Sequence, residues 1–231
     1  MVKARISVIL PTYNERANLP VIIKQIRQLP IEVECVVVDD NSPDGTGELA
    51  ERLASTDPLI KVVHRPKKLG LASAVLDGLQ KASAPYVAVM DADLQHPPNL
   101  LPSMVNLLDS GADLVVASRY VRGGGVAGWS IFRYFISRCA TILAHLLIPR
   151  SRVVKDPMSG YFALKRSVLE GLHLDSNMGY KILLSILAKA KLTVVKEVPM
   201  IFRRRLRGES KLGQKEILNY LRLLKDLLGK D

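Results

Sequence analysis

Cysteine and long apolar runs are both scarce in this sequence. Its 231 residues include only two cysteines, Cys35 and Cys139, and neither has a CxxC partner, which argues against a disulfide scaffold or a cysteine-based zinc site. We interpret both as buried, reduced thiols. No uninterrupted apolar run reaches the ~18 residues that a membrane-spanning helix needs, and the first apolar run is too short for a signal peptide. We therefore expect a cytoplasmic protein without a leader or transmembrane span, able to lie on a membrane surface.

The sequence also lacks two common nucleotide-binding signatures. No G-x-G-x-x-G follows the first predicted strand, and no G-x-x-x-x-G-K-[ST] occurs in the chain, which argues against a nicotinamide enzyme and a P-loop ATPase. A run of three glycines at 123–125 is open to two interpretations, a flexible loop or a cradle for phosphate.

Basic residues are in excess. Lys and Arg number 33 against 22 Asp and Glu, a formal net charge of +11, which indicates an anionic partner such as a phosphorylated substrate, a lipid surface or nucleic acid. The cation-rich segment 203–211 suits a solvated loop, a nucleic-acid patch or a clamp over a diphosphate. Few aromatic residues are interleaved with these cations, so base stacking has little support. We expect no nucleic-acid partner.

Strand-like and helix-like segments alternate over the first 120 residues. This alternation predicts an α/β fold with a mostly parallel sheet flanked by helices and joined by right-handed crossovers. We expect one domain over 1–212 and a C-terminal amphipathic helix over 213–231. The last strand, 193–202, is broken by Pro199 and should lie at a sheet edge. The other strands are expected at 6–10, 35–38, 60–63, 86–90 and 113–117, with a short one ending at 164.

The strand at 86–90 carries the most informative side chains. Its residues Tyr-Val-Ala-Val-Met have no polar face, so it should be covered on both sides. Asp91 and Asp93 follow it and share one side of an extended backbone. Two adjacent like charges repel unless a cation or hydrogen-bond donors neutralise them. The pair therefore indicates a metal ion at the carboxyl edge of the sheet, where such sheets bind ligands.

The segment at about 129–148 has apolar residues at helical spacing, with arginines among them. Arg133 and Ser137 are four residues apart and share a face. The stripe is compatible with a helix packed on the core, and equally with an interfacial helix whose apolar side meets lipid while its arginines meet phosphate.

Five motifs together resemble those of glycosyltransferase family 2 enzymes of GT-A (Rossmann-like) fold, and most closely the dolichol-phosphate mannose synthases. They occur in the family's order and spacing over residues from about 5 to 212. The motifs are LPTYNE at 10–15, VDDNSPDG at 38–45, MDADLQHP at 90–97, SRY at 118–120 and RGESK at 207–211.

The resemblance implies Mg²⁺ or Mn²⁺ as cofactor, with Asp93 and Gln95 as ligands, and it implies amphipathic interfacial helices. Oxygen ligands suit these hard cations. Asp91, Asp93 and Arg119 would take part in catalysis. The residues implied for the nucleotide-sugar are Pro11, Tyr13, Glu15, Val38, Asp40, Asp91, Ala92, Asp93, Arg205 and Lys211.

The resemblance also implies an acceptor-phosphate site formed by Arg119, Arg133 and Ser137. His96 is expected to be a turn or supporting residue directed outward by the two prolines that follow it. Asp156 is open to two interpretations, steering the acceptor or stabilising its loop.

The implied reaction is the inverting transfer of mannose from GDP-mannose to dolichyl or another polyprenyl phosphate. That phosphate is already ionised at neutral pH, so a protein base is unnecessary. A related enzyme using a UDP-sugar, with glucose or an N-acetylhexosamine, is the first alternative, and a non-catalytic nucleotide- or RNA-binding module is the second. Membrane association is expected through the amphipathic helices and the basic charge, through a membrane-anchoring subunit, or through a segment outside this chain.

Overall fold

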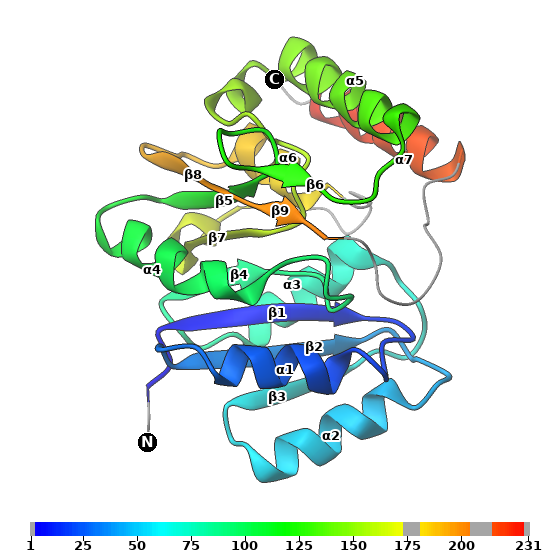
Figure 1. The fold of residues 1–231 in the computed structure, drawn as a ribbon, viewed down its shortest axis with the longest axis vertical. Helices are drawn as coiled ribbons and strands as arrows, with labels where there is room; N and C mark the ends of the chain where they lie inside the picture. Colours follow the sequence, from blue (N-terminus) through cyan, green and yellow to red (C-terminus); the bar gives the residue numbers. More distant parts are fainter. Residues whose placement is uncertain (1–2, 173–180, 204–213, 229–231) are drawn as a thin grey trace.

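A computed structural model gives the fold and describes residues 3–172, 181–203 and 214–228, with side chains for all of these except 214–217 (Figure 1). A seven-stranded sheet runs through its middle in the order β3-β2-β1-β4-β7-β5-β8. Every strand of this sheet except β7 runs in the same direction, because only the β4–β7 and β5–β7 pairs are antiparallel. The strands are β1 (Ile6–Thr12), β2 (Val33–Asp39), β3 (Ile60–His64), β4 (Tyr86–Val89), β5 (Leu114–Ser118), β7 (Phe162–Lys165) and β8 (Val195–Pro199).

Helices cover both faces of the sheet, as predicted. Apolar side chains of α1 (Leu19–Arg27), α2 (Thr46–Thr56) and α4 (Leu101–Asp109) share one core with one face. The opposite face packs against α3 (Leu71–Lys81) and α6 (Ile182–Lys189). Strands β1, β2 and β5 are buried almost throughout, which their β-branched and apolar residues allow because both faces are covered.

The predicted edge strand is confirmed and the glycine run is explained. β8 lies at one edge of the sheet and ends at Pro199, while β9 (Ile201–Phe202) pairs with β6 (Gly125–Val126) in a separate small sheet. A Cβ on Gly124 would lie 2.5 Å from the carbonyl oxygen of Ser118. Close backbone packing and a short strand therefore account for the glycines, and the phosphate-cradle interpretation is unnecessary.

Helices α5 (Ile131–Leu147) and α7 (Gln214–Leu228) lie side by side at one end of the molecule (Figure 1). The Tyr220 hydroxyl donates to the carbonyl of Ala140 at 2.6 Å, and Leu223 and Leu224 are buried in the same cluster as Ala144. Among the described helices, none combines the length and the apolar character that a membrane span needs.

The first half of α5 does not pack on the core. Ile131 is 90% exposed, Phe132 73% and Phe135 64%. Cys139, on the same helix, is also exposed, so the prediction of two buried thiols is correct only for Cys35. The physical reason is that the apolar stripe of α5 faces away from the protein over this stretch.

Candidate active site

The carboxyl ends of the parallel strands bring the predicted residues to one edge of the sheet. The loop after β1 is held to the loop after β2, because Asn14 N donates to Ser42 Oγ at 3.0 Å and Glu15 N to Thr46 Oγ1 at 3.0 Å. Tyr13 is partly buried, and Lys68 Nζ lies 3.6 Å from the centre of its ring.

The residues predicted for the nucleoside differ in what they expose. Pro11, Tyr13 and Glu15 are partly accessible, whereas Val38 is fully buried in the core. The carbonyl oxygen of Val38 accepts a hydrogen bond from Thr12 Oγ1 at 3.2 Å. Val38 therefore contributes to this edge through its backbone and shapes it through packing.

Asp40 is buried and ion-paired with Arg65, a residue that motif reading did not single out. Gly70 N donates to Asp40 Oδ2 at 3.1 Å, and Arg65 also donates to the Gly70 carbonyl at 3.1 Å. The pair fixes the segment before α3 against the end of β2. The sequence offered one signal for this pair: Arg65 directly follows β3, and β3 lies beside β2, the strand that Asp40 follows.

After β4 the chain makes a tight acidic turn. Leu94 has φ +65°, a left-handed conformation that costs a branched residue energy and that the surroundings must enforce. Within the turn, Gln95 N donates to Asp93 Oδ1 at 3.1 Å. Asp91 is partly exposed, whereas Ala92, Asp93 and Gln95 are nearly buried.

His96 points inward, so the prediction of an outward side chain is wrong. The residue is 2% exposed, and its ring lies 5.4 Å from the ring of Tyr161 and 5.3 Å from that of Phe202. Its Nδ1 accepts a hydrogen bond from Asp91 N at 3.1 Å. Burial lowers its pKa, in keeping with a neutral ring that accepts at Nδ1. The two prolines fix the backbone, and the aromatic cluster decides where the ring goes.

The donor chemistry of the acidic turn fits a hard divalent cation. Gln95 Nε2 donates to the Arg203 carbonyl at 2.9 Å, which leaves the amide oxygen as the other polar atom of that side chain. Asp93 supplies a buried carboxylate. No group of three or more His, Cys, Asp or Glu side chains is placed to hold a metal within the described ranges. Mg²⁺ does not require one, since one or two protein carboxylates, water and substrate phosphates complete its shell.

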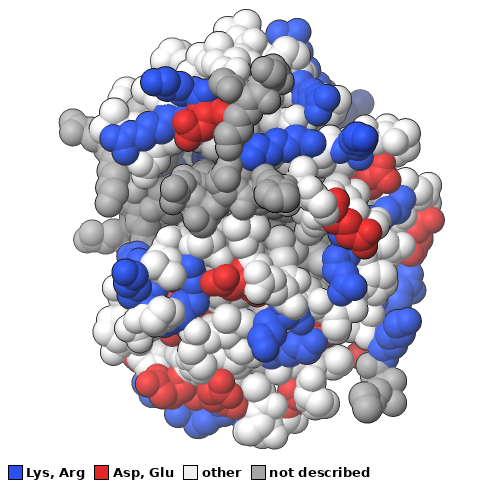
Figure 2. All heavy atoms as spheres, turned by 180° about the vertical axis from the view of Figure 1, so that it is seen from behind, with Lys and Arg blue, Asp and Glu red and all other residues white. Residues whose placement is uncertain are grey.

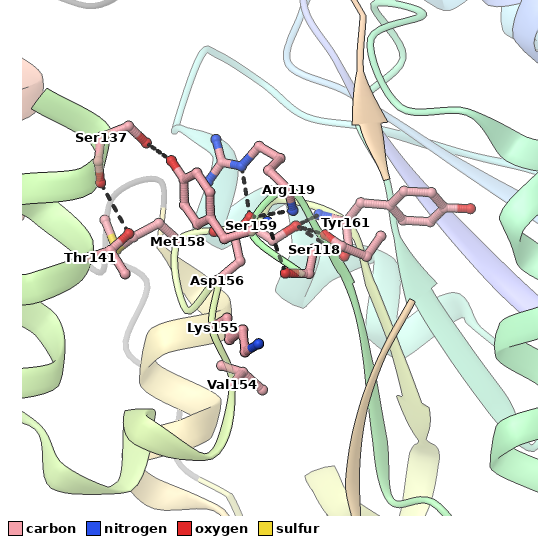
Figure 3. A network of polar contacts seen from close by, with 12 residues as sticks. Ser118, Arg119, Ser137, Thr141, Val154, Lys155, Asp156, Met158, Ser159 and Tyr161 are labelled. Carbon is pink, nitrogen blue, oxygen red and sulfur yellow. Dashed lines mark hydrogen bonds and ion pairs between the residues drawn. The ribbon is translucent and has the colours of Figure 1, made fainter. Parts of the chain in front are cut away.

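Arg119, at the end of β5, is held by Asp156 (Figure 3). Its Nε donates to Asp156 Oδ2 and its Nη2 to Oδ1, both at 2.7 Å, and its backbone N donates to Oδ2 at 3.0 Å. Asp156 is fully buried. Glu197 on β8 accepts from the backbone N of Lys155 at 2.8 Å and of Asp156 at 3.3 Å. The geometry supports a loop-organising role for Asp156, with Arg119 fixed by it.

Aromatic rings bring the other two predicted acceptor residues beside Arg119. The guanidinium carbons of Arg119 and Arg133 lie 5.4 and 4.4 Å from the centre of a Trp129 ring. Ser137 receives a hydrogen bond from the Tyr120 hydroxyl at 2.7 Å, and Arg119 lies 5.2 Å from the Tyr120 ring. Residues from β5 and α5 thus form one cationic cluster.

Comparison with known sequences decides the family. Residues 7–172 match the family model described as glycosyl transferase family 2. The chain belongs to this family.

Two family members with curated names are similar over most of the chain. The dolichol-phosphate mannosyltransferase of Pyrococcus furiosus is 47% identical over 220 residues, which are 94% of this chain and 62% of that protein. The dolichol-phosphate mannosyltransferase of Saccharomyces cerevisiae is 37% identical over 234 residues, covering 96% of this chain and 86% of that protein. The chain thus spans less than two thirds of the length of the archaeal relative.

Solved structures confirm the GT-A fold of this family 2 chain. Glucosyl-3-phosphoglycerate synthase from Mycobacterium tuberculosis, crystallised with Mn²⁺, UDP-glucose and phosphoglyceric acid, superposes with a TM-score of 0.72 at 23% identity, covering 98% of this chain and 80% of that one. The same enzyme with Mg²⁺ and UDP gives a TM-score of 0.71, also at 23% identity, with 98% and 80% covered.

Two residues predicted for the donor in this family 2 chain, Arg205 and Lys211, lie outside the described residues. The chain approaches the acidic turn just before them, because Arg203 N donates to the Gln95 carbonyl at 3.1 Å.

One charged residue near the site belongs to none of the five motifs. Lys181, directly before α6, donates from Nζ to the Met158 carbonyl at 3.3 Å. Burial lowers its pKa to about 8, and the charges of Arg119, Asp156 and Asp91 act on it. Its position just before an apolar run was the only sequence cue.

Proposed function

We propose that this chain transfers mannose from GDP-mannose to dolichyl or another polyprenyl phosphate, with inversion at the anomeric carbon. One observation carries the proposal most directly. The acidic turn at Asp91–Asp93 and the cationic cluster of Arg119 and Arg133 stand at the same edge of one sheet, with His96 packed next to Asp91. One group suits a metal–diphosphate and the other a phosphate monoester. The names of both curated relatives agree with this pair of substrates.

On the donor side, Asp93 and Gln95 would hold Mg²⁺ or Mn²⁺, and Asp91 would orient the sugar. When bound, the metal neutralises charge on the donor diphosphate. Pro11, Tyr13, Glu15, the Val38 backbone, Asp40 and Ala92 would line the nucleoside side, and Arg205 and Lys211 would pair with the diphosphate.

On the acceptor side, Arg119, Arg133 and Ser137 would bind the phosphate of the lipid. The second pKa of a phosphate monoester is about 6, so the nucleophile arrives largely dianionic at neutral pH. No protein base is then needed at the attacking oxygen. His96, whose Nδ1 is occupied by Asp91 N and whose ring is buried, fits a structural role.

The lipid acceptor requires contact with a membrane surface. The exposed face of α5 presents Ile131, Phe132 and Phe135, and Leu218 and Leu221 of α7 add exposed apolar area beside it. In the upper half of the face seen in Figure 2, where these helices lie, most charged side chains are Lys or Arg. An apolar surface bordered by cations suits the interface of an anionic bilayer. The chain would act at the cytoplasmic face, alone or with a membrane-anchoring subunit.

The decisive experiment offers labelled GDP-mannose, UDP-glucose and UDP-N-acetylglucosamine in parallel, with dolichyl phosphate and Mn²⁺ or Mg²⁺. Mannosyl transfer from GDP-mannose alone is the expected result, and transfer only from a UDP-sugar would overturn the mannose assignment. Asp93→Asn should abolish both transfer and the rise in melting temperature that Mn²⁺ plus GDP gives the wild type. A Glu32→Gln variant, altered at an exposed carboxylate directly before β2 and so at the opposite edge of the sheet, is the matched control.

A further inference from the structure

Lys181 is a partly buried cation whose ammonium group contacts the loop that carries Asp156. Its ammonium group makes one hydrogen bond to protein among the described residues, to the Met158 carbonyl at 3.3 Å. An ammonium carries three donors and no acceptor, so this bond leaves most of its capacity unused. Within the described ranges no carboxylate lies within ion-pair distance of Nζ.

The surroundings disfavour the charged ammonium. Loss of water around Lys181 is the largest cause of its lowered pKa, and the positive charge of Arg119 is the next. Lys181 also stands at the N-terminus of α6, where the helix dipole is positive. A charge kept in such a place costs stability, and that cost persists in proteins mainly where function requires it.

The carboxylate of Asp156, which acts on Lys181, is already engaged. Both oxygens of Asp156 accept hydrogen bonds from Arg119. Asp91, whose charge also acts on Lys181, lies on the donor side of the site. Lys181 and Arg119 are thus like charges that both feel the Asp156 carboxylate, and Arg119 already binds both of its oxygens. A ligand that carries two negative charges would relieve the repulsion and accept hydrogen bonds from Lys181.

We propose that Lys181 binds the acceptor phosphate from the side of α6, opposite Arg133 and Ser137 on α5, so that the phosphate lies between Lys181 and Arg119. The proposal rests on the proposed function, since it assumes a phosphate monoester as acceptor. It adds a charged contact that fixes the phosphate from a second element of the fold.

The test is the binding of farnesyl phosphate, a short water-soluble prenyl phosphate, measured by calorimetry without donor. Lys181→Met removes the charge and keeps much of the side-chain length. We expect roughly a tenfold or greater loss of affinity, the scale of one charge-assisted hydrogen bond, with GDP binding in Mn²⁺ unchanged. Lys181→Arg should recover part of the affinity. Lys191→Met, at an exposed lysine just beyond α6, is the matched control and should bind as wild type.

The melting temperature separates a functional from a structural lysine. If Lys181 binds the acceptor, Lys181→Met should melt at or above the wild-type temperature, because a poorly compensated charge has been removed. A lower melting temperature with unchanged farnesyl phosphate affinity would overturn the proposal, and so would a loss of GDP affinity alone. If the wild type transfers mannose and Lys181→Met keeps the wild-type affinity for farnesyl phosphate, only the role of Lys181 is refuted. Wild-type protein that binds no prenyl phosphate refutes the proposed acceptor as well.

Discussion

The Asp156 carboxylate accepts two hydrogen bonds of 2.7 Å from the Arg119 side chain and a third, of 3.0 Å, from the Arg119 backbone N. The carboxylate is fully buried and lies 37 residues further along the chain. The contact raises the already high pKa of the guanidinium and fixes its plane. In the proposed reaction this orientation leaves Arg119 ready to receive the acceptor phosphate without rearrangement.

Asp156→Asn should therefore lower both stability and acceptor binding. A neutral amide cannot balance the buried guanidinium, and breaking one side of a buried pair costs about 3 kcal/mol in the free energy of unfolding. Urea denaturation measures that cost, and steady-state kinetics should show a larger rise in KM for lipid phosphate than for the sugar nucleotide. The matched control is Asp109→Asn in the exposed Arg5–Asp109 pair, for which at most about 1 kcal/mol is expected. Equal losses in both variants would contradict the account.

Glu197 should act as a positioning residue through the loop that carries Asp156. Its carboxylate accepts hydrogen bonds from the backbone N of Lys155 and Asp156. Glu197→Gln replaces one acceptor oxygen with a donor and should raise KM for the lipid phosphate severalfold while kcat changes less, and Glu197→Asp should restore part of the effect. Lys196→Gln, at the exposed neighbour on β8, should behave as wild type. An unchanged KM in Glu197→Gln would show that the loop holds Asp156 without this contact.

The pH dependence of transfer should report Lys181. Burial and the charge of Arg119 lower its pKa to about 8, while Asp156 and Asp91 act in the opposite sense. The ammonium is therefore deprotonated above about pH 8. Since the charged form binds phosphate in this account, kcat/KM for the lipid phosphate should fall above that pH. The fall should be absent from the already weakened Lys181→Met variant.

Loss of fold is not the expected cause of that decline. The unfolded chain keeps the proton up to the ordinary lysine pKa of 10.5, so between pH 8 and 10.5 the unfolded state binds more protons than the folded state. The contribution of Lys181 to the free energy of unfolding therefore rises with pH in that window. Circular dichroism across the same range would reveal unfolding, and unfolding that tracks the loss of activity would contradict the explanation.

The exposed end of α5 should bind lipid bilayers. Replacing Ile131, Phe132 and Phe135 with Asp removes apolar area and adds negative charge, so co-flotation with liposomes containing anionic lipid should be strongly reduced, while transfer to water-soluble farnesyl phosphate persists. Val21→Asp, at an exposed apolar residue of α1, is the control. Retained flotation of the triple variant would show that another surface or the charge alone makes the contact.

The sequence predicted the elements whose side chains pack in a regular pattern. The buried strands and the acidic pair after β4 were recognisable because alternation and strand ends follow from local chemistry. The inward turn of His96 was missed because its partners Tyr161 and Phe202 come from distant segments. Cys139 was misplaced because a helical apolar stripe shows that one face is apolar, and not whether that face meets protein.

The contacts that organise the site were harder to predict than the residues that carry the motifs. The Arg65–Asp40 pair, the grip of Asp156 on Arg119 and the approach of Lys181 each join segments that only the folded sheet brings together. Periodicity says nothing about such pairs, and the spacing of motifs gives their order along the chain without their partners.

The choice between dolichyl phosphate and unphosphorylated dolichol is the sharpest test of the proposed phosphate nucleophile. With GDP-mannose and Mn²⁺, we expect transfer to dolichyl phosphate and none to dolichol, because only the phosphate arrives ionised and no side chain is proposed as a base. The product should be β-linked mannosyl phosphate, formed from the α-linked donor by one inversion, as read from the anomeric coupling in its NMR spectrum. Transfer to dolichol at a comparable rate, or an α-linked product, would contradict the account.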